Sequence, residues 1–319
     1  MSAPISLNQN TSFMRISTII IFLFYLINIH ATEFGTHWMC YPEPDDSSQI
    51  WFRQTFQSNQ KPKIGKIALA STGRCQLYVN GRRVGREVYT SNIENDSMCI
   101  IERNYDITNI LRKDSNTIAI WYSPGTKSNT DKQISLYYYG IDAKGNRFSH
   151  PLNENWYCRI SPGITGKNNS ESYRSIGYFP RWKYNTVNLL GWEHPIESSD
   201  NTLYTLRSKI TPITKQEITH IYYPEQICKE ENQYRCHFTK PFSGWIRLTI
   251  RDAKVGQIVN IGNYTYICNG SMDEQACRRF TKEYQQDVII SGDERFKKLS
   301  IQNIEGLEIE EQTEDFFTY

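Results

Sequence analysis

Short apolar segments separated by turn-forming residues recur along this chain roughly every ten residues, a spacing typical of β-structure. Residues 245–250 (Trp-Ile-Arg-Leu-Thr-Ile) alternate apolar and polar side chains, as a half-buried strand does. Residues 118–122 (Ile-Ala-Ile-Trp-Tyr) form a β-branched and aromatic run that ends at Ser-Pro-Gly. Segments 256–262 and 287–292 predict further strands, whereas helical periodicity is confined to one turn around residues 107–111. The pattern predicts an all-β protein built from sandwiches or barrels.

Two hairpins are predicted from turn chemistry. Asn80-Gly81 follows Leu-Tyr-Val and precedes Arg-Arg-Val, and this pair can adopt the two positive φ angles that a type I′ turn requires. Asp142-Ala-Lys-Gly145 separates the strand-like residues 134–140 from the returning Arg147-Phe148.

The length of 319 residues favours about two domains of roughly 150 residues each. Strand signals are dense over residues 49–139 and resume after residue 205, with a polar, turn-like run at residues 197–201 between them. We therefore expect a first domain over residues 32–200 and a second over residues 201–319. Within the first, residues 150–197 are expected to form a long aromatic loop region.

The N-terminus predicts export. Arg15 precedes an apolar run of about a dozen residues, which is short for a membrane span and suits the core of a signal peptide. Ala31, with Ile29 at the −3 position, is the expected cleavage site, so residues 1–31 are interpreted as a signal peptide. We expect a periplasmic or extracellular protein with no stable membrane anchor, and an uncleaved N-terminal anchor is the alternative.

The amino-acid composition limits the classes of partner that the protein is expected to bind. The 36 basic and 34 acidic side chains leave a net charge of +2, which argues against a nucleic-acid binder and suits a neutral polysaccharide. The 21 Tyr, 14 Phe and 7 Trp argue against a disordered chain. Tyr and Trp serve both β-sheet packing and stacking on sugar rings, and composition alone does not choose between these uses.

Eight cysteines lie beyond the predicted signal peptide. Cys228 with Cys236, and Cys268 with Cys277, are spaced to close hairpin-sized disulfide loops. The alternative is that they are small buried side chains. No spacing of Cys or His suggests a metal site, and we expect no cofactor.

Two sets of segments resemble successive domains of a known enzyme family. Phe52–Phe56, Ile67–Ser71, Leu77–Gly81, Tyr105–Thr108 and Asn116–Ile120 come in an order that resembles the N-terminal jelly-roll module of bacterial α-L-rhamnosidases (glycoside hydrolase family 78-like). Phe242–Leu248, Gly256–Val259, Asp287–Asp293 and Phe296–Leu299 are similar to the concanavalin-like β-sandwich that follows it in those enzymes. The resemblance implies two jelly-roll or concanavalin-like β-sandwich domains in tandem.

The resemblance also implies that catalysis lies elsewhere. Such rhamnosidases carry their catalytic carboxylates on a helical toroid C-terminal to these sandwiches, and no counterpart is recognised before Tyr319. The carboxylate pairs Asp45-Asp46 and Asp273-Glu274 are interpreted as solvated loop or strand positions. We therefore expect no catalytic residue in this chain, which the resemblance presents as a truncated or non-catalytic portion of the enzyme.

Aromatic residues gather in the expected loop region and form the candidate carbohydrate-binding site. Trp and Tyr rings stack on the C–H faces of sugars, while charged and amide groups hold the hydroxyls. The candidate residues are Trp156, Tyr178, Arg181, Trp182, Tyr184, Trp192, Glu193 and His194. The alternative interpretation is that these aromatics pin the loop onto the sandwich or pack one domain on the next.

Three functions are consistent with the sequence. The first is a non-catalytic part of a rhamnosidase-like glycoside hydrolase, which acts with a separately encoded catalytic domain on rhamnose-containing polysaccharide. The second is a free-standing carbohydrate-binding protein. The third is a structural or adhesive β-sandwich protein with a protein partner. The first predicts an apolar patch on the second sandwich where a catalytic domain would dock.

Overall fold

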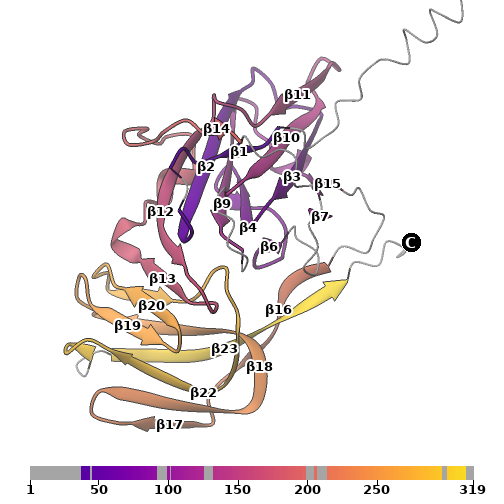
Figure 1. Cartoon of the computed structure of the whole chain (residues 1–319). Helices are drawn as coiled ribbons and strands as arrows, with labels where there is room; N and C mark the ends of the chain where they lie inside the picture. Colours follow the sequence, from indigo (N-terminus) through magenta and orange to yellow (C-terminus); the bar gives the residue numbers. More distant parts are fainter. Residues whose placement is uncertain are drawn as a thin grey trace, which may run out of the picture.

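The computed structural model describes residues 37–43, 45–91, 99–100, 102–125, 132–198, 205–206, 214–296 and 300–313. Nearly all regular structure in these ranges is β, which confirms the predicted fold class (Figure 1). The helical turns are the short 3-10 segments η1 (Thr108–Ile110), η2 (Ser175–Gly177) and η3 (Pro180–Lys183), and η1 matches the single helical turn predicted from the sequence. None of the helical segments in the described ranges is long and apolar enough to cross a membrane. The predicted signal peptide lies outside the described residues.

The first module is a sandwich of two sheets. One sheet has the order β14-β1-β10-β3-β8, with β11 paired to β10, and its strands are β1 (Met39–Cys40), β3 (Ile64–Ser71), β8 (Arg103–Asp106), β10 (Ile134–Ile141), β11 (Arg147–Pro151) and β14 (Ile196–Glu197). The facing strands are β2 (Ser48–Gln57), β4 (Arg74–Val79), β5 (Arg82–Arg83), β6 (Thr90–Ser91), β9 (Ser115–Ser123), β12 (Tyr157–Thr165) and β13 (Glu171–Arg174). Leu69 and Leu136 of the first sheet pack with Phe52 and Ile120 of the second in one core.

The second module extends the larger sheet. Its strands are β16 (Thr214–Tyr222), β17 (Gln226–Lys229), β18 (Gln233–Arg251), β19 (Ile258–Ile261), β20 (Tyr264–Ile267), β21 (Asp273–Ala276), β22 (Glu283–Gly292) and β23 (Ser300–Thr313). A short parallel pair, β7 (Cys99–Ile100) with β15 (Thr205–Leu206), stands apart. Strands β13 and β20 pair in parallel, Glu171 to Tyr264 through Arg174 to Ile267, so one sheet runs through both modules (Figure 1).

Strands β2 and β9 are buried on both faces. Phe52 and Ile120 point into the sandwich core, whereas Trp51 and Trp121 belong to a second core that continues into the second module. Since side chains alternate along a strand, this double burial explains why the sequence of β9 reads as a continuous apolar run. Trp51, Trp121 and Trp245 are buried, at 2%, 1% and 6% exposure.

The segment expected to be an aromatic loop region contains two strands that the sequence did not predict. β12 pairs with β2 and has a register shift between Ile160 and Ile164, and β13 pairs with β12. The irregular ladder interrupts the alternation of apolar and polar side chains, so no simple period marks β12. The boundary expected at residue 200 remains a prediction, since residues 199–204 lie outside the described ranges.

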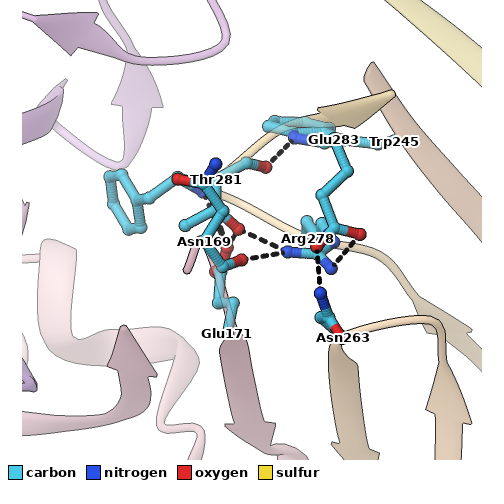
Figure 2. Close-up of polar contacts among 8 residues, drawn as sticks. Asn169, Glu171, Trp245, Asn263, Arg278, Thr281 and Glu283 are labelled. Carbon is cyan, nitrogen blue, oxygen red and sulfur yellow. Dashed lines mark hydrogen bonds and ion pairs between the residues drawn. The ribbon is translucent and has the colours of Figure 1, made fainter. Parts of the chain in front are cut away.

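A buried polar joint fastens the two modules together (Figure 2). The carboxylate of Glu171, on β13, accepts a hydrogen bond from the backbone N–H group of Thr281 at 3.0 Å. It also accepts from the backbone N–H groups of Arg279 and Phe280 at 3.1 and 3.2 Å. Arg278 Nη1 donates to the carbonyl of Asn169 at 2.6 Å, on the turn that leads into β13. These four bonds each cross from one module to the other, so the joint fixes their relative placement.

Of the predicted disulfide partners, Cys228, Cys236, Cys268 and Cys277 are free thiols. In the β17–β18 ladder Cys228 lies opposite Arg235, and Cys236 lies opposite Ile227. The two cysteines are therefore out of register and their side chains leave opposite faces of the sheet. Burial raises the pKa of Cys236 to about 11 and that of Cys268 to about 12, as expected for small buried side chains.

Candidate functional site

A cleft of about 590 Å³ opens on the first module, between the end of β2 with the loop after it and the β10–β11 hairpin. Its volume lies within the range of small-molecule sites. The hairpin exists because Asp142 accepts hydrogen bonds from the backbone N–H groups of Lys144 and Asn146, both at 2.8 Å. These bonds, of which the one from Asn146 contributes most, hold the pKa of Asp142 below its usual value. This carboxylate at the rim of the cleft is therefore already hydrogen-bonded within its own turn.

Aromatic side chains form the floor of this cleft. Phe56 stacks on His150 with ring centroids 5.1 Å apart and lies 5.1 Å from Tyr138. Phe148 lies 4.9 Å from Tyr138 and 5.4 Å from His150. Partial burial lowers the pKa of His150, which favours the neutral imidazole. The floor is therefore an uncharged, largely apolar surface on which the Phe56 and Phe148 rings are partly exposed and Tyr138 is buried.

Unpaired amides form one wall. Gln57, Asn59 and Gln60 line the cleft from the strand end and the following loop, and all three are exposed. Among the described residues none of their side chains has a hydrogen-bond partner, in contrast to Asn116, which also lines the cleft but accepts from Arg112 N–H at 2.8 Å. An aromatic floor beside free donors and acceptors can bind a molecule that has both apolar faces and hydroxyls.

The structure places the three tryptophans of the sequence-predicted site in the core. Trp182 and Trp156 are 0% and 1% exposed and Trp192 is 9% exposed. Trp182 stacks on Trp51 with centroids 4.9 Å apart and planes 6° from parallel. Trp192 stacks on the same ring at 6.4 Å. Burial leaves these rings no face for a sugar, and their packing matches the alternative interpretation, in which they pin the segment onto the sheet.

The remaining predicted residues are more exposed but do not converge. Tyr178 is half-buried against Trp51 and Trp121, Arg181 is exposed on η3, and the ring of Tyr184 lies over the Asn80-Gly81 turn. Glu193 accepts a hydrogen bond from Tyr41 Oη at 3.2 Å. His194 bonds the carbonyl of Trp156 at 2.9 Å and packs against Tyr157.

One residue of the sequence-predicted site, Trp156, lies next to the cleft. Trp156 lies directly behind the cleft floor, with its ring centroid 6.2 Å from that of Phe56. The cleft residues themselves were missed in the sequence. The available signal was the polar run at residues 57–60 immediately after an apolar strand, facing a hairpin that carries Phe148 and His150.

Residues 60–149 match the family described as the alpha-L-rhamnosidase N-terminal domain, and this range includes most of the cleft. The chain is similar to the N-terminal part of α-L-rhamnosidases. The predicted resemblance is thereby confirmed. No curated protein matches the chain in sequence.

Solved α-L-rhamnosidases share the fold. The enzyme from Dictyoglumus thermophilum matches with a TM-score of 0.78 and 18% identity, over 88% of this chain and 36% of that one. The Streptomyces avermitilis enzyme, solved in complex with L-rhamnose, matches at 0.74 and 15%, over 83% and 29%. The Aspergillus terreus enzyme matches at 0.74 and 15%, over 87% and 36%. The chain thus spans about a third of the length of these enzymes.

Proposed function

We propose that this chain is the exported, non-catalytic β-sandwich portion of an α-L-rhamnosidase-like glycoside hydrolase, and that it binds carbohydrate. A relationship to α-L-rhamnosidases is supported by the family match over residues 60–149 and by the fold shared with three such enzymes. The glycosidase activity would belong to a further catalytic domain, because no catalytic carboxylate pair was identified in the sequence.

The cleft between β2 and the β10–β11 hairpin carries the binding proposal. Its aromatic floor offers the partly exposed rings of Phe56 and Phe148, which pack against the buried Tyr138. Partly exposed aromatic rings are the kind of surface on which the C–H face of a sugar packs. Its free amides at Gln57, Asn59 and Gln60 supply both donors and acceptors for hydroxyls.

A rhamnose-containing glycan fits this chemistry. L-Rhamnose carries a methyl group where most hexoses carry a hydroxymethyl group, so one edge of its ring is apolar and suits the aromatic floor. The charged groups at the rim are Lys144 and Asp142, and the Asp142 carboxylate is bonded within its own turn. With one positive group and one carboxylate that is already hydrogen-bonded, the rim favours a neutral sugar.

Calorimetric titration of the protein with rhamnose-bearing oligosaccharides tests the proposal. Gln60→Ala removes an amide that lines the cleft, and the neighbouring Lys61→Ala, exposed and outside the cleft, is its matched control. We expect Gln60→Ala and Phe148→Ala each to weaken binding by about tenfold, equivalent to about 1.4 kcal/mol, and Lys61→Ala to leave it unchanged. Absence of binding to any rhamnose-bearing polysaccharide would favour a structural or adhesive role.

A scaffold role is the second candidate. Ile218 and Ile221 of β16, and Tyr223 just beyond it, are 42%, 49% and 62% exposed, and β16 is an end strand of the large sheet. A catalytic domain docked on the second module would cover such side chains. Co-purification with a separately expressed rhamnosidase catalytic domain, reduced by Ile221→Ser and Tyr223→Ser but not by Gln60→Ala, would support this role.

Export is proposed from the N-terminal sequence alone, with Arg15 before the apolar run and Ala31 at the cleavage site. N-terminal sequencing of the protein secreted by its native cells tests it. We expect a mature chain that starts at Thr32, and recovery of an intact N-terminus in the membrane fraction would favour the uncleaved anchor.

A further inference from the structure

A second pocket, of about 380 Å³, lies between the modules and shares no residue with the cleft. Arg74, Tyr89 and Asn168 line it from the first module, and Ser243, Lys282 and Tyr284 line it from the second. Because the polar joint at Glu171 fixes the two modules, the backbone positions that carry these side chains are held together.

Arg74 presents an unsatisfied guanidinium group to this pocket. Its contact is with the face of the Tyr89 ring, 5.5 Å from Cζ to the ring centroid. Its Nη1 atom is buried and has no hydrogen-bond partner among the described residues. A guanidinium carries five N–H donors in a planar fork, and leaving them unbonded while partly buried is costly. The other two nitrogens of the group, Nε and Nη2, reach the surface without a hydrogen-bond partner among the described residues, so a ligand in the pocket can supply acceptors to them.

Lys282 adds a second positive charge. Its ammonium donates to Gln216 Oε1 at 2.9 Å, and Gln216 in turn donates to Glu311 at 2.6 Å, so its direct partner is a neutral amide. Burial lowers the pKa of Lys282, the charge of Arg74 acts in the same direction, and Glu311 opposes them. Two cations thus share the pocket, and an anion between them would relieve their repulsion.

The carboxylate that also lines the pocket is already engaged. Glu283 forms an ion pair with Arg278 Nη2 at 2.7 Å and accepts a hydrogen bond from Asn263 Nδ2 at 2.9 Å (Figure 2). It serves as the counter-ion of Arg278 within the joint and does not neutralise Arg74.

We propose that this interdomain pocket binds the carboxylate of an acidic saccharide, a uronic acid residue, between Arg74 and Lys282. The fork of a guanidinium matches a carboxylate in bidentate geometry, and the ammonium adds a point charge. Tyr284, 71% exposed, offers a ring face to the sugar, and Asn168 and Ser243 offer hydrogen-bonding groups. The saccharide part of the inference rests on the proposed carbohydrate-binding function, whereas the acidic group is argued from the pocket alone.

Titration of the whole protein with methyl β-D-glucuronide, and with methyl β-D-glucoside as the neutral counterpart, tests the inference. We expect the glucuronide to bind and the glucoside to bind at least tenfold more weakly. Arg74→Gln and Lys282→Gln should each weaken glucuronide binding by about tenfold, Arg74→Lys by less, and Arg82→Gln, on the exposed strand β5, not at all. Equal binding of both sugars, or no effect of Arg74→Gln in a folded variant, overturns the inference.

A replacement variant and a titration with phosphate complete the test. If Arg74→Gln does not fold, Tyr284→Ala at its exposed site replaces it, with an expected loss of several-fold; unchanged binding would count against a sugar in the pocket. Inorganic phosphate that binds as tightly as the glucuronide would indicate a general anion site and also overturn the inference. Gln60→Ala should leave glucuronide binding intact, so failure at the cleft and failure at this pocket are distinguishable.

Discussion

Glu171 and Thr281 are joined by two hydrogen bonds across the boundary between the modules, from the backbone N–H at 3.0 Å and from Oγ1 at 2.9 Å (Figure 2). The Glu171 carboxylate is 3% exposed and also receives the N–H groups of Arg279 and Phe280. Hydrogen bonds to a charged, buried acceptor are stronger than those between neutral groups.

We therefore expect Glu171→Gln to lower the free energy of unfolding by about 3 kcal/mol, because an amide has one acceptor oxygen and its NH₂ group would face backbone donors. Scanning calorimetry would show a lower melting temperature and separate transitions for the two modules. Glu197→Gln, on the exposed strand β14, is the control and should change little. A single transition at an unchanged temperature would show that the joint does not couple the modules.

Trp182 supports the fold rather than a ligand. Its ring is fully buried, stacks on Trp51 and meets the edges of Tyr78 and Trp121. We expect Trp182→Ala to cost roughly 3–5 kcal/mol of unfolding free energy, measured by urea denaturation. Tyr184→Ala, with the ring 39% exposed on the same segment, should cost less than half as much. Loss of sugar binding by Trp182→Ala without loss of stability would restore the sugar-stacking interpretation.

The sequence predicted the turns and strands that are determined by residues close to one another in the chain. The Asn80-Gly81 turn forms with φ angles of 53° and 81°, because only residues that tolerate the left-handed region fit there. The strand at 118–122 was predicted from its β-branched and aromatic run, and the strand at 245–250 from its alternation of apolar and polar side chains. These features depend on residues that are neighbours in the chain.

The parts that were missed depend on residues far apart in the chain. The parallel pairing of β13 with β20 joins segments about ninety residues apart, and no periodicity marks it. The aromatic excess of the segment around Trp182 suited a ligand site, but the segment packs against Trp51, which is 131 positions earlier. Gln60 and Phe148, 88 positions apart in the sequence, also line one cleft.

Gly81 is expected to tolerate no side chain. Besides its φ of +81°, an added Cβ would lie 2.1 Å from the Tyr184 ring. Gly145, in the other hairpin, has a φ of +99° with nothing within 4 Å, so Gly145→Ala measures the backbone cost alone, about 1–2 kcal/mol. We expect Gly81→Ala to lower the free energy of unfolding by clearly more than Gly145→Ala does, and the double variant Gly81→Ala/Tyr184→Ala to recover the excess. Equal costs for the two glycines would mean that the Tyr184 ring moves aside freely.

Asp45 and Lys132 predict a specific pH dependence. The Lys132 ammonium is fully buried and lies 2.9 Å from Asp45 Oδ1, which also accepts from the N–H groups of Ser47 and Ser48 at 2.7 and 2.6 Å. Partial burial by itself would raise the pKa of Asp45, but hydrogen bonds from Ser48, Lys132 and Ser47 outweigh it and hold this pKa well below its usual range. The stabilisation is therefore complete above the unfolded value of about 3.9 and is lost as the pH falls below it, toward the folded value.

Replacing Asp45 by Asn should move this loss to neutral pH, because the buried ammonium then lacks a counter-ion. We expect the free energy of unfolding at pH 7 to fall by about 2 kcal/mol, less than for a fully buried pair, since Asp45 is 43% exposed. Burial already lowers the pKa of Lys132, and without Asp45 it should fall further, so the variant should regain stability as the pH rises toward about 10. Urea denaturation across the pH range measures both effects. The exposed Asp46→Asn is the control, and Asp45→Asn/Lys132→Met should recover most of the loss; a variant equally destabilised at pH 7 and pH 10 would contradict the charge-pair explanation.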